Sequence, residues 1–185
     1  FADEPKIGRS PDMRYHFVAK APPVLPHRPV VVGFGPAGIF AALLLAQRKN
    51  GTPMSLTALS MGDERALHWL RYLMALGFEE AVLLETAADL RFAPEFIARQ
   101  ITDWQRHHGA DLIITGCQSS EGQNGQTPFL MAEMLAWPCF TQVERFTLTP
   151  PFVVVEQRTT TGLRRCRVRL PAVIAVRQCG EVALP

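Results

Sequence analysis

The strongest candidate for chemistry in this sequence is a set of backbone N–H groups at a predicted helix start. An apolar run at residues 112–114 enters a polar loop at 116–127, and an apolar-periodic helix follows. Thr127 has the side chain of an N-cap, and Pro128 fits the first helical turn. The first N–H groups of a helix lack partners within it, and together with the helix dipole they attract phosphate. The sequence therefore predicts an anion-binding loop, and the alternative is a solvated surface loop.

A second glycine loop follows the valines at residues 30–32. Gly33, Gly35 and Gly38 have the dinucleotide spacing, in which glycines permit a tight turn, close approach of a pyrophosphate and close helix–strand packing. The carboxylate that would hold a ribose hydroxyl is absent from residues 57–62. The loop is therefore either an FAD or NAD site or a turn that serves only the fold. Two phosphate-type loops in one chain point to a nucleotide or dinucleotide cofactor.

Both loops lie in a pattern of short apolar runs that alternate with helical periodicity. We expect strands at residues 30–33, 55–60, 81–84 and 112–115, and helices at 41–47, 63–75 and 94–107. Such alternation predicts an α/β fold, a doubly wound parallel sheet of the Rossmann-like, adenine nucleotide-binding kind with helices on both faces. We expect further strands at residues 140–148, 152–158, 163–170 and 172–176, with a hairpin turn at Thr161–Gly162. These predict antiparallel strands added near the C-terminus.

The chain length fits a single domain with a substantial core. The 185 residues divide into a proline-rich N-terminal arm, residues 1–28, and one α/β nucleotide-binding domain, residues 29–185. The start of the chain has no secretory signal and no initiator methionine, so we expect a fragment or a processed form.

Bulk composition and side-chain spacing argue against several classes of function. The net charge of +2 is too small to predict nucleic-acid or membrane binding, and no apolar run approaches the roughly 20 residues of a membrane span. No arrangement of side chains predicts a catalytic or a metal-binding residue. The four cysteines, Cys117, Cys139, Cys166 and Cys179, form no Cys-x-x-Cys pair. We expect reduced thiols in a cytoplasmic protein.

Arg165, Arg167 and Arg169 alternate along one predicted strand, so they share a face. Such a row more often marks a solvated edge that discourages aggregation than a docking surface.

Residues 46–185 resemble the β subunit of electron transfer flavoproteins. The resemblance rests on four segments in the family's order, residues 55–62, 73–81, 111–127 and 170–176. It implies an electron carrier subunit, rather than an enzyme with its own substrate, that holds AMP or FAD and pairs with an α subunit. It also implies the residues that line the nucleotide site: Met61, Gly116, Gln118, Gly125, Gln126 and Thr127.

The loop departs from the family's pattern at two positions. The family usually has lysine after the first loop glycine, where this chain has Cys117, and it usually has an aspartate where Glu121 is the nearest acid. Loss of a cation near a phosphate predicts weaker binding by about 1 kcal/mol or more.

Residues 14–47 instead resemble the opening of an FAD-dependent dehydrogenase, chiefly through residues 28–38. The two resemblances predict a chimera in which residues 29–47 form a Rossmann-type βα unit and residues 48–185 the electron transfer flavoprotein β-like part. A natural gene fusion and an engineered chimera both account for this.

Three functional interpretations remain open at this point. The first is a nucleotide-binding electron carrier domain, the second an FAD/NAD-binding Rossmann oxidoreductase fragment, and the third a folded chimeric domain without activity. Under the first, the expected partner is an α-like subunit. In its absence, exposed apolar surface favours a homodimer.

Overall fold

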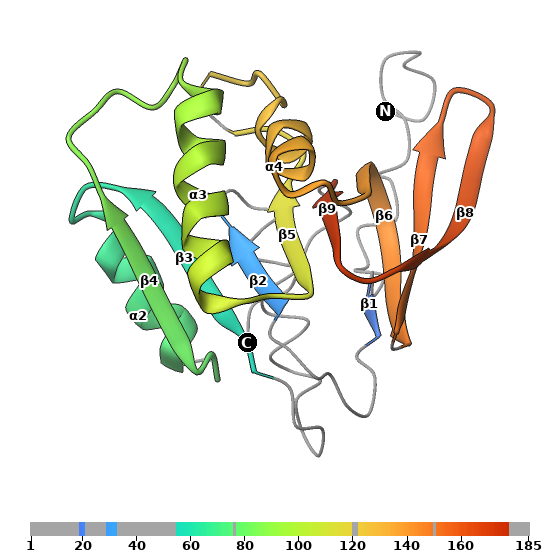
Figure 1. The fold of residues 1–185 in the computed structure, drawn as a ribbon, viewed down its shortest axis with the longest axis horizontal. Coiled ribbons are helices and arrows are strands. Elements are labelled where there is room, and N and C mark those ends of the chain that lie inside the picture. The colour runs from blue at the N-terminus through green and yellow to red at the C-terminus, as the bar shows by residue number, and fades with distance from the viewer. Residues whose placement is uncertain are drawn as a thin grey trace, which may run out of the picture.

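The computed structural model describes residues 19–20, 29–32, 55–75, 77–119, 122–149 and 151–177. Its strands are β1 (Ala19–Lys20), β2 (Pro29–Val32), β3 (Thr57–Gly62), β4 (Glu80–Glu85), β5 (Leu112–Gly116), β6 (Cys139–Thr149), β7 (Phe152–Thr159), β8 (Gly162–Arg169) and β9 (Ala172–Val176). Its helices are α2 (Ala66–Ala75), α3 (Pro94–His108) and α4 (Thr127–Leu135). These nine strands form one sheet (Figure 1).

Five strands make up what we call the parallel half of the sheet, in the spatial order β4, β3, β2, β5 and β9. The chain moves outward from β2 through β3 to β4, and then β5 pairs with the opposite side of β2. The direction of winding therefore reverses between β2 and β5. In open α/β sheets, ligands bind outside the carboxyl ends of the strands at such a reversal.

Helices cover both faces of the parallel half, so its strands are apolar on both sides. Neighbouring residues of one strand enter separate core clusters, because side chains alternate across a sheet. The cluster on the α2 side includes Val31, Ile114, Ile174, Leu70 and Leu73. The cluster on the α3 and α4 side includes Val30, Ile113, Val173, Ile101 and Met131. Figure 1 accordingly shows α3 and α4 in front of the sheet and α2 behind it.

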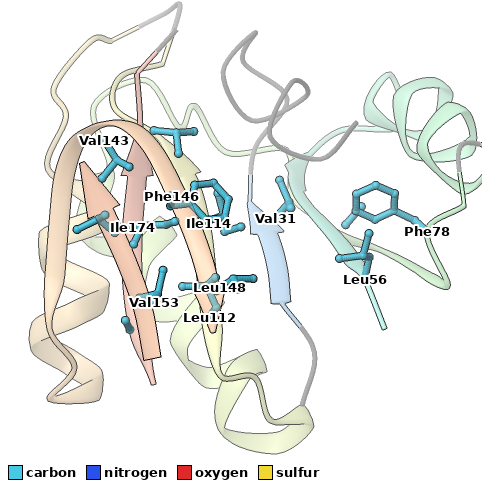
Figure 2. Packing of buried hydrophobic residues seen from close by; sticks show 14 of the residues in the cluster. Val31, Leu56, Phe78, Leu112, Ile114, Val143, Phe146, Leu148, Val153 and Ile174 are labelled. Carbon is cyan, nitrogen blue, oxygen red and sulfur yellow. The ribbon is translucent and has the colours of Figure 1, made fainter. Parts of the chain in front are cut away.

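The later part of β6 together with β7 and β8 forms what we call the antiparallel extension. The first residues of β6 pair in parallel with β9, whereas its later residues pair with β7 and, on the other side, with β1. The register shifts between Phe140 and Val143, and between them Gln142 has a positive φ of 54°. A bulge of this kind bends a strand. Inward side chains of the extension, among them Phe146, Leu148 and Val153, join the α2-side cluster (Figure 2).

The predicted fold class is confirmed, with element ends that shift by a few residues. The strand expected at 172–176 is β9, and the strand expected at 112–115 is β5, which extends to Gly116. The helix expected from residue 63 begins at Ala66 instead, because the Asp63 carboxylate accepts the Arg65 N–H at 3.0 Å in the turn before it. The hairpin turn lies one residue earlier than expected, since Thr159 pairs with Gly162 and Thr160–Thr161 connects the strands.

Several predictions fall on residues outside those that the structure describes. They include the helix at 41–47, most of the arm at 1–28, and Gly33, Gly35 and Gly38. The domain boundaries also stay a prediction. Among the described helices the longest, α3, has 15 residues, and none is both long and apolar enough to cross a membrane.

Candidate functional site

The candidate site lies at the carboxyl edge of the parallel half, where the winding reverses. Val32 ends β2 and pairs with Leu59 of β3 on one side and with Thr115 of β5 on the other. Gly116, the last residue of β5, therefore lies level with Ser60, and Met61 stands one residue further along β3. The structure thus brings Met61 and Gly116 to the same edge, on strands separated by β2.

The two ends of the loop after β5 approach each other closely. Gly125 has a φ of +61°, and a Cβ built on it would stand 3.2 Å from the Cys117 carbonyl oxygen and 3.6 Å from Cγ of Gln118. Only glycine tolerates both this dihedral angle and this approach without strain. Gly125 therefore lies beside Cys117 and Gln118, the two residues that follow Gly116.

The middle of this loop packs on the segment that follows β4. Gly122 has a φ of +72°, and a Cβ there would stand 2.0 Å from the Arg91 carbonyl oxygen. Nδ2 of Asn124 donates to the same carbonyl oxygen at 3.5 Å. Arg91 is itself fixed by the Asp89 carboxylate, with a shortest contact of 2.7 Å. These Arg91 hydrogen bonds lower the pKa of Asp89 to about 2.

Helix α4 begins with unused backbone donors. Gln126 is the N-cap residue and Thr127 the first helical residue, so the predicted cap at Thr127 is wrong by one position. The cap side chain makes no capping hydrogen bond, and Pro128 stands in the first turn as predicted. The Gln126 N–H is taken by Oδ1 of Asn124 at 3.2 Å, and the Leu130 N–H by the Gln126 carbonyl at 3.1 Å.

Thr127 and Phe129 are left with N–H groups that have no partner among the described residues. Pro128, between them, has no N–H. Two donors therefore point out of the helix start beside the loop, in the geometry that binds anions. Gln126 and Thr127 flank these donors with polar side chains for which the described residues likewise provide no hydrogen bond.

Cys117 occupies the position after Gly116, and its thiol is used within the fold. The sulfur donates to the Ala175 carbonyl and accepts the Gln142 N–H, both at 3.3 Å. Burial raises the pKa of this thiol, although the Gln142 hydrogen bond and the nearby Arg177 act in the opposite direction. The thiol is therefore neutral at pH 7 and brings no positive charge to the loop.

Sequence analysis missed the contribution of the segment after β4. Its contacts with Gly122 and Asn124 join residues about 30 positions apart. A glycine and an asparagine in a polar loop are common turn residues, so neither type signals a long-range contact. No group of three or more His, Cys, Asp or Glu suited to a metal ion occurs in the described part of the chain.

Chemically, the site offers backbone donors, amide and hydroxyl side chains, and a thioether at Met61. These groups can hold a phosphate and a flat, partly apolar ring. Of the described groups with a shifted pKa near the loop, Asp89 pairs with Arg91, and the Cys117 thiol is hydrogen-bonded within the fold.

Comparison with known proteins identifies the family. Residues 38–181 match the electron transfer flavoprotein domain. The chain is 86% identical over 145 residues to the electron transfer flavoprotein subunit YgcR of Escherichia coli K12. The aligned residues cover 78% of this chain and 56% of that protein. It is 26% identical over 138 residues to the electron transfer flavoprotein subunit beta of Bacillus subtilis, covering 74% of this chain and 52% of the relative.

The human electron transfer flavoprotein subunit beta is 29% identical over 119 residues, which cover 63% of this chain and 47% of that protein. The chain thus spans about half the length of the curated relatives that it matches. The similarity agrees with the predicted resemblance and with the observed doubly wound sheet. The chain belongs to the electron transfer flavoprotein family and is β-subunit-like.

Proposed function

We propose that this chain is the nucleotide-binding part of an electron transfer flavoprotein β-like subunit and that it holds AMP or FAD at the loop between β5 and α4. The observation that carries the proposal is a pair of N–H groups, on Thr127 and Phe129, that find no partner in the described part of the chain. They lie next to the point where the sheet reverses its winding. A phosphate there gains two backbone hydrogen bonds and the positive end of the α4 dipole.

Each predicted site residue has a physical role in this proposal. Gly116 and Gly125 let the backbone come close to the ligand, because they carry no side chain. Gln118, Gln126 and Thr127 supply hydrogen bonds to the ribose and phosphate. The Met61 thioether offers a polarizable contact for the adenine ring. FAD, when bound, would supply the electron-transfer chemistry, and the residues of this chain bind and orient it.

Isothermal titration of the full chain with AMP and with FAD tests the site. The double substitution of Gln126→Ala with Thr127→Ala should weaken binding by about tenfold, because it removes side-chain hydrogen bonds to the ligand. The matched control is Thr160→Ala in the β7–β8 turn, which should bind as the unchanged chain does. Equal affinity for all three proteins would contradict the proposal. Mass spectrometry of the small molecule that co-purifies would separate AMP from FAD.

A second candidate function uses the loop after β2. Strand β2 lies between β3 and β5, which is where the first strand of a Rossmann unit stands in the order β4, β3, β2, β5. The family match begins only at residue 38. This candidate is a dehydrogenase-like βα unit at residues 29–47, joined to a β-like remainder, with FAD or NAD on Gly33, Gly35 and Gly38. It rests on the glycine spacing, because the family match includes residues 38–47.

Mutation of Gly35 separates the two candidates. Gly35→Val should abolish flavin binding under the second candidate and leave binding at the β5–α4 loop intact under the first. If the chain is a chimera without activity, it is colourless and shows no thermal shift with AMP, ADP, FAD or NAD.

The proposal extends to partners and to location. An α-like subunit is the expected partner, by analogy with the paired subunits of the family, and a homodimer is the alternative in its absence. Co-purification with an α-like subunit and size-exclusion chromatography distinguish the two. We also propose a cytoplasmic location, supported by the free thiols of Cys117, Cys139 and Cys166.

A further inference from the structure

Strand β8 ends the sheet and carries a row of arginines. Among the described residues it pairs with β7 alone, so its other edge has backbone groups without a neighbouring strand. Arg165, Arg167 and Arg169 are all exposed and share the outer face of the strand, where Leu163 is 61% exposed. Alternate residues of a strand stand about 6.6–6.8 Å apart, so the Cα atoms of the three arginines repeat at this interval.

The rest of this outer face neutralises the arginines only in part. Arg165 lies 3.9 Å from the Glu156 carboxylate, and Arg167 stacks on the Phe152 ring with 3.8 Å from Cζ to the ring centre. Arg169 forms no ion pair with any described residue. On β6, Arg145 is exposed and pairs in register with Glu156, which adds a further positive charge to the same face.

The opposite face of β8 is apolar where it meets the core. Val168 belongs to the α2-side cluster, and Cys166 packs against that cluster while staying partly exposed. A strand added beside β8 would therefore meet arginines on one face and the border of the core on the other. The unpaired backbone groups, the arginines and the apolar side chains of β8 each recur at every second residue, as the groups of an added β-strand do.

We infer that the β8 edge binds an extended segment of a partner protein in which acidic and apolar residues alternate. The segment adds a strand to the sheet, so its main chain hydrogen-bonds with the free edge of β8. Its carboxylates face Arg165, Arg167 and Arg169, where arginine forms charge-assisted hydrogen bonds. Its apolar residues lie beside Cys166 and Val168.

Charge argues against one other occupant of this edge, and backbone pairing argues against a second. A second copy of β8, paired antiparallel about a two-fold axis, would set arginine against arginine across the strands, which is destabilising. A nucleic acid would match the charges but could not pair with the backbone edge. The chain as a whole also carries a net charge of only +2.

The experiment uses the full chain and a fluorescein-labelled ten-residue peptide of alternating glutamate and valine, followed by fluorescence anisotropy. We expect saturable binding, together with slower amide hydrogen exchange at residues 162–169. A peptide with the same composition but with all glutamates before all valines should bind at least about tenfold more weakly, because it loses the alternation. Two N-methylated peptides are also needed, one methylated at the odd positions and one at the even positions. At least one of them should not bind, because N-methylation removes main-chain hydrogen-bond donors.

Protein variants provide the matched control. Arg165→Glu with Arg167→Glu should weaken peptide binding by at least about tenfold. Arg71→Glu with Arg99→Glu makes the same change in net charge on α2 and α3, away from β8, and should leave the affinity within about twofold.

Three results would overturn the inference. They are equal losses in the two double variants, undiminished binding of both N-methylated peptides, and tighter binding of a ten-nucleotide single-stranded DNA that displaces the peptide. Absence of peptide binding to the unchanged chain would also overturn it.

Discussion

The parallel half and the antiparallel extension share one sheet but use their two faces differently. In β5 and β9 successive residues are buried on both faces, because α3 and α4 lie on one side and inward side chains of the antiparallel extension, such as Phe146, pack on the other (Figure 2). In β7 only alternate residues are buried, and the intervening ones lie on the outer face with the β8 arginines. Where both faces of the sheet are buried, a ligand can reach only the ends of the strands. Where one face is buried, the other face and the edge strand are accessible to a partner.

The largest test of this comparison uses two neighbouring residues of β5. Ile113→Ala and Ile114→Ala should each lower the free energy of unfolding by about 2–5 kcal/mol, since each side chain is fully buried in a different cluster. Urea unfolding followed by circular dichroism measures both. A small effect from either substitution would show that one face of the parallel half is not packed.

The matching pair in β7 should behave asymmetrically. Val153 is fully buried, and Val153→Ala should cost about 2 kcal/mol through lost burial and the cavity that remains. Val154 is on the outer face and only partly buried, so Val154→Ala should cost well under about 1 kcal/mol. Similar urea midpoints for the two variants would remove the distinction between the two halves.

A glycine pair tests whether the site loop depends on the segment after β4. Gly122→Ala places a Cβ 2.0 Å from the Arg91 carbonyl oxygen, so one of the two segments must move. Gly109→Ala has nearly the same φ, +71° against +72°, with nothing within 4 Å. The first should therefore be less stable than the second by about 1–3 kcal/mol, the cost of overpacking. Equal melting curves would mean that the loop does not dock on Arg91.

The smallest predicted effect concerns Cys139, the first residue of β6, which pairs with Val173 of β9. Burial raises the pKa of this thiol to about 11, with a further contribution from nearby Cys117. The reactive thiolate is therefore scarce at pH 8, and the rate of alkylation should increase about tenfold per pH unit until pH approaches that pKa. Iodoacetamide labelling with peptide mass mapping provides the rates. A plateau near pH 9 would show an ordinary, solvated thiol.

The sequence predicts the individual strands and helices of the parallel half better than the order of the strands in the sheet. The apolar runs at residues 112–115 and 172–176 predict strands because uninterrupted burial leaves little ambiguity. Pro128 located the start of α4, although the preference of threonine for caps moved the predicted cap from Gln126 to Thr127. Nothing in the local pattern shows that β9 inserts between β5 and β6, since strand order depends on contacts between distant segments.

The candidate site was predictable to a similar degree. Gly116 and Gly125 were predicted as site residues through the resemblance of residues 111–127 to the family's nucleotide loop. The bond from Asn124 to Arg91 and the positive φ of Gln142 carry none, because both arise from tertiary packing. The sequence could predict that the helix start would have free N–H groups. Which residues carry these groups became clear only from the observed start of α4.

A crystal structure of the full chain grown with AMP tests the central claim most directly. The account predicts that the AMP phosphate lies within hydrogen-bonding distance of the Thr127 and Phe129 N–H groups, with the adenine near Met61. A phosphate bound elsewhere, or AMP absent from the β5–α4 loop at saturating concentration, would contradict it.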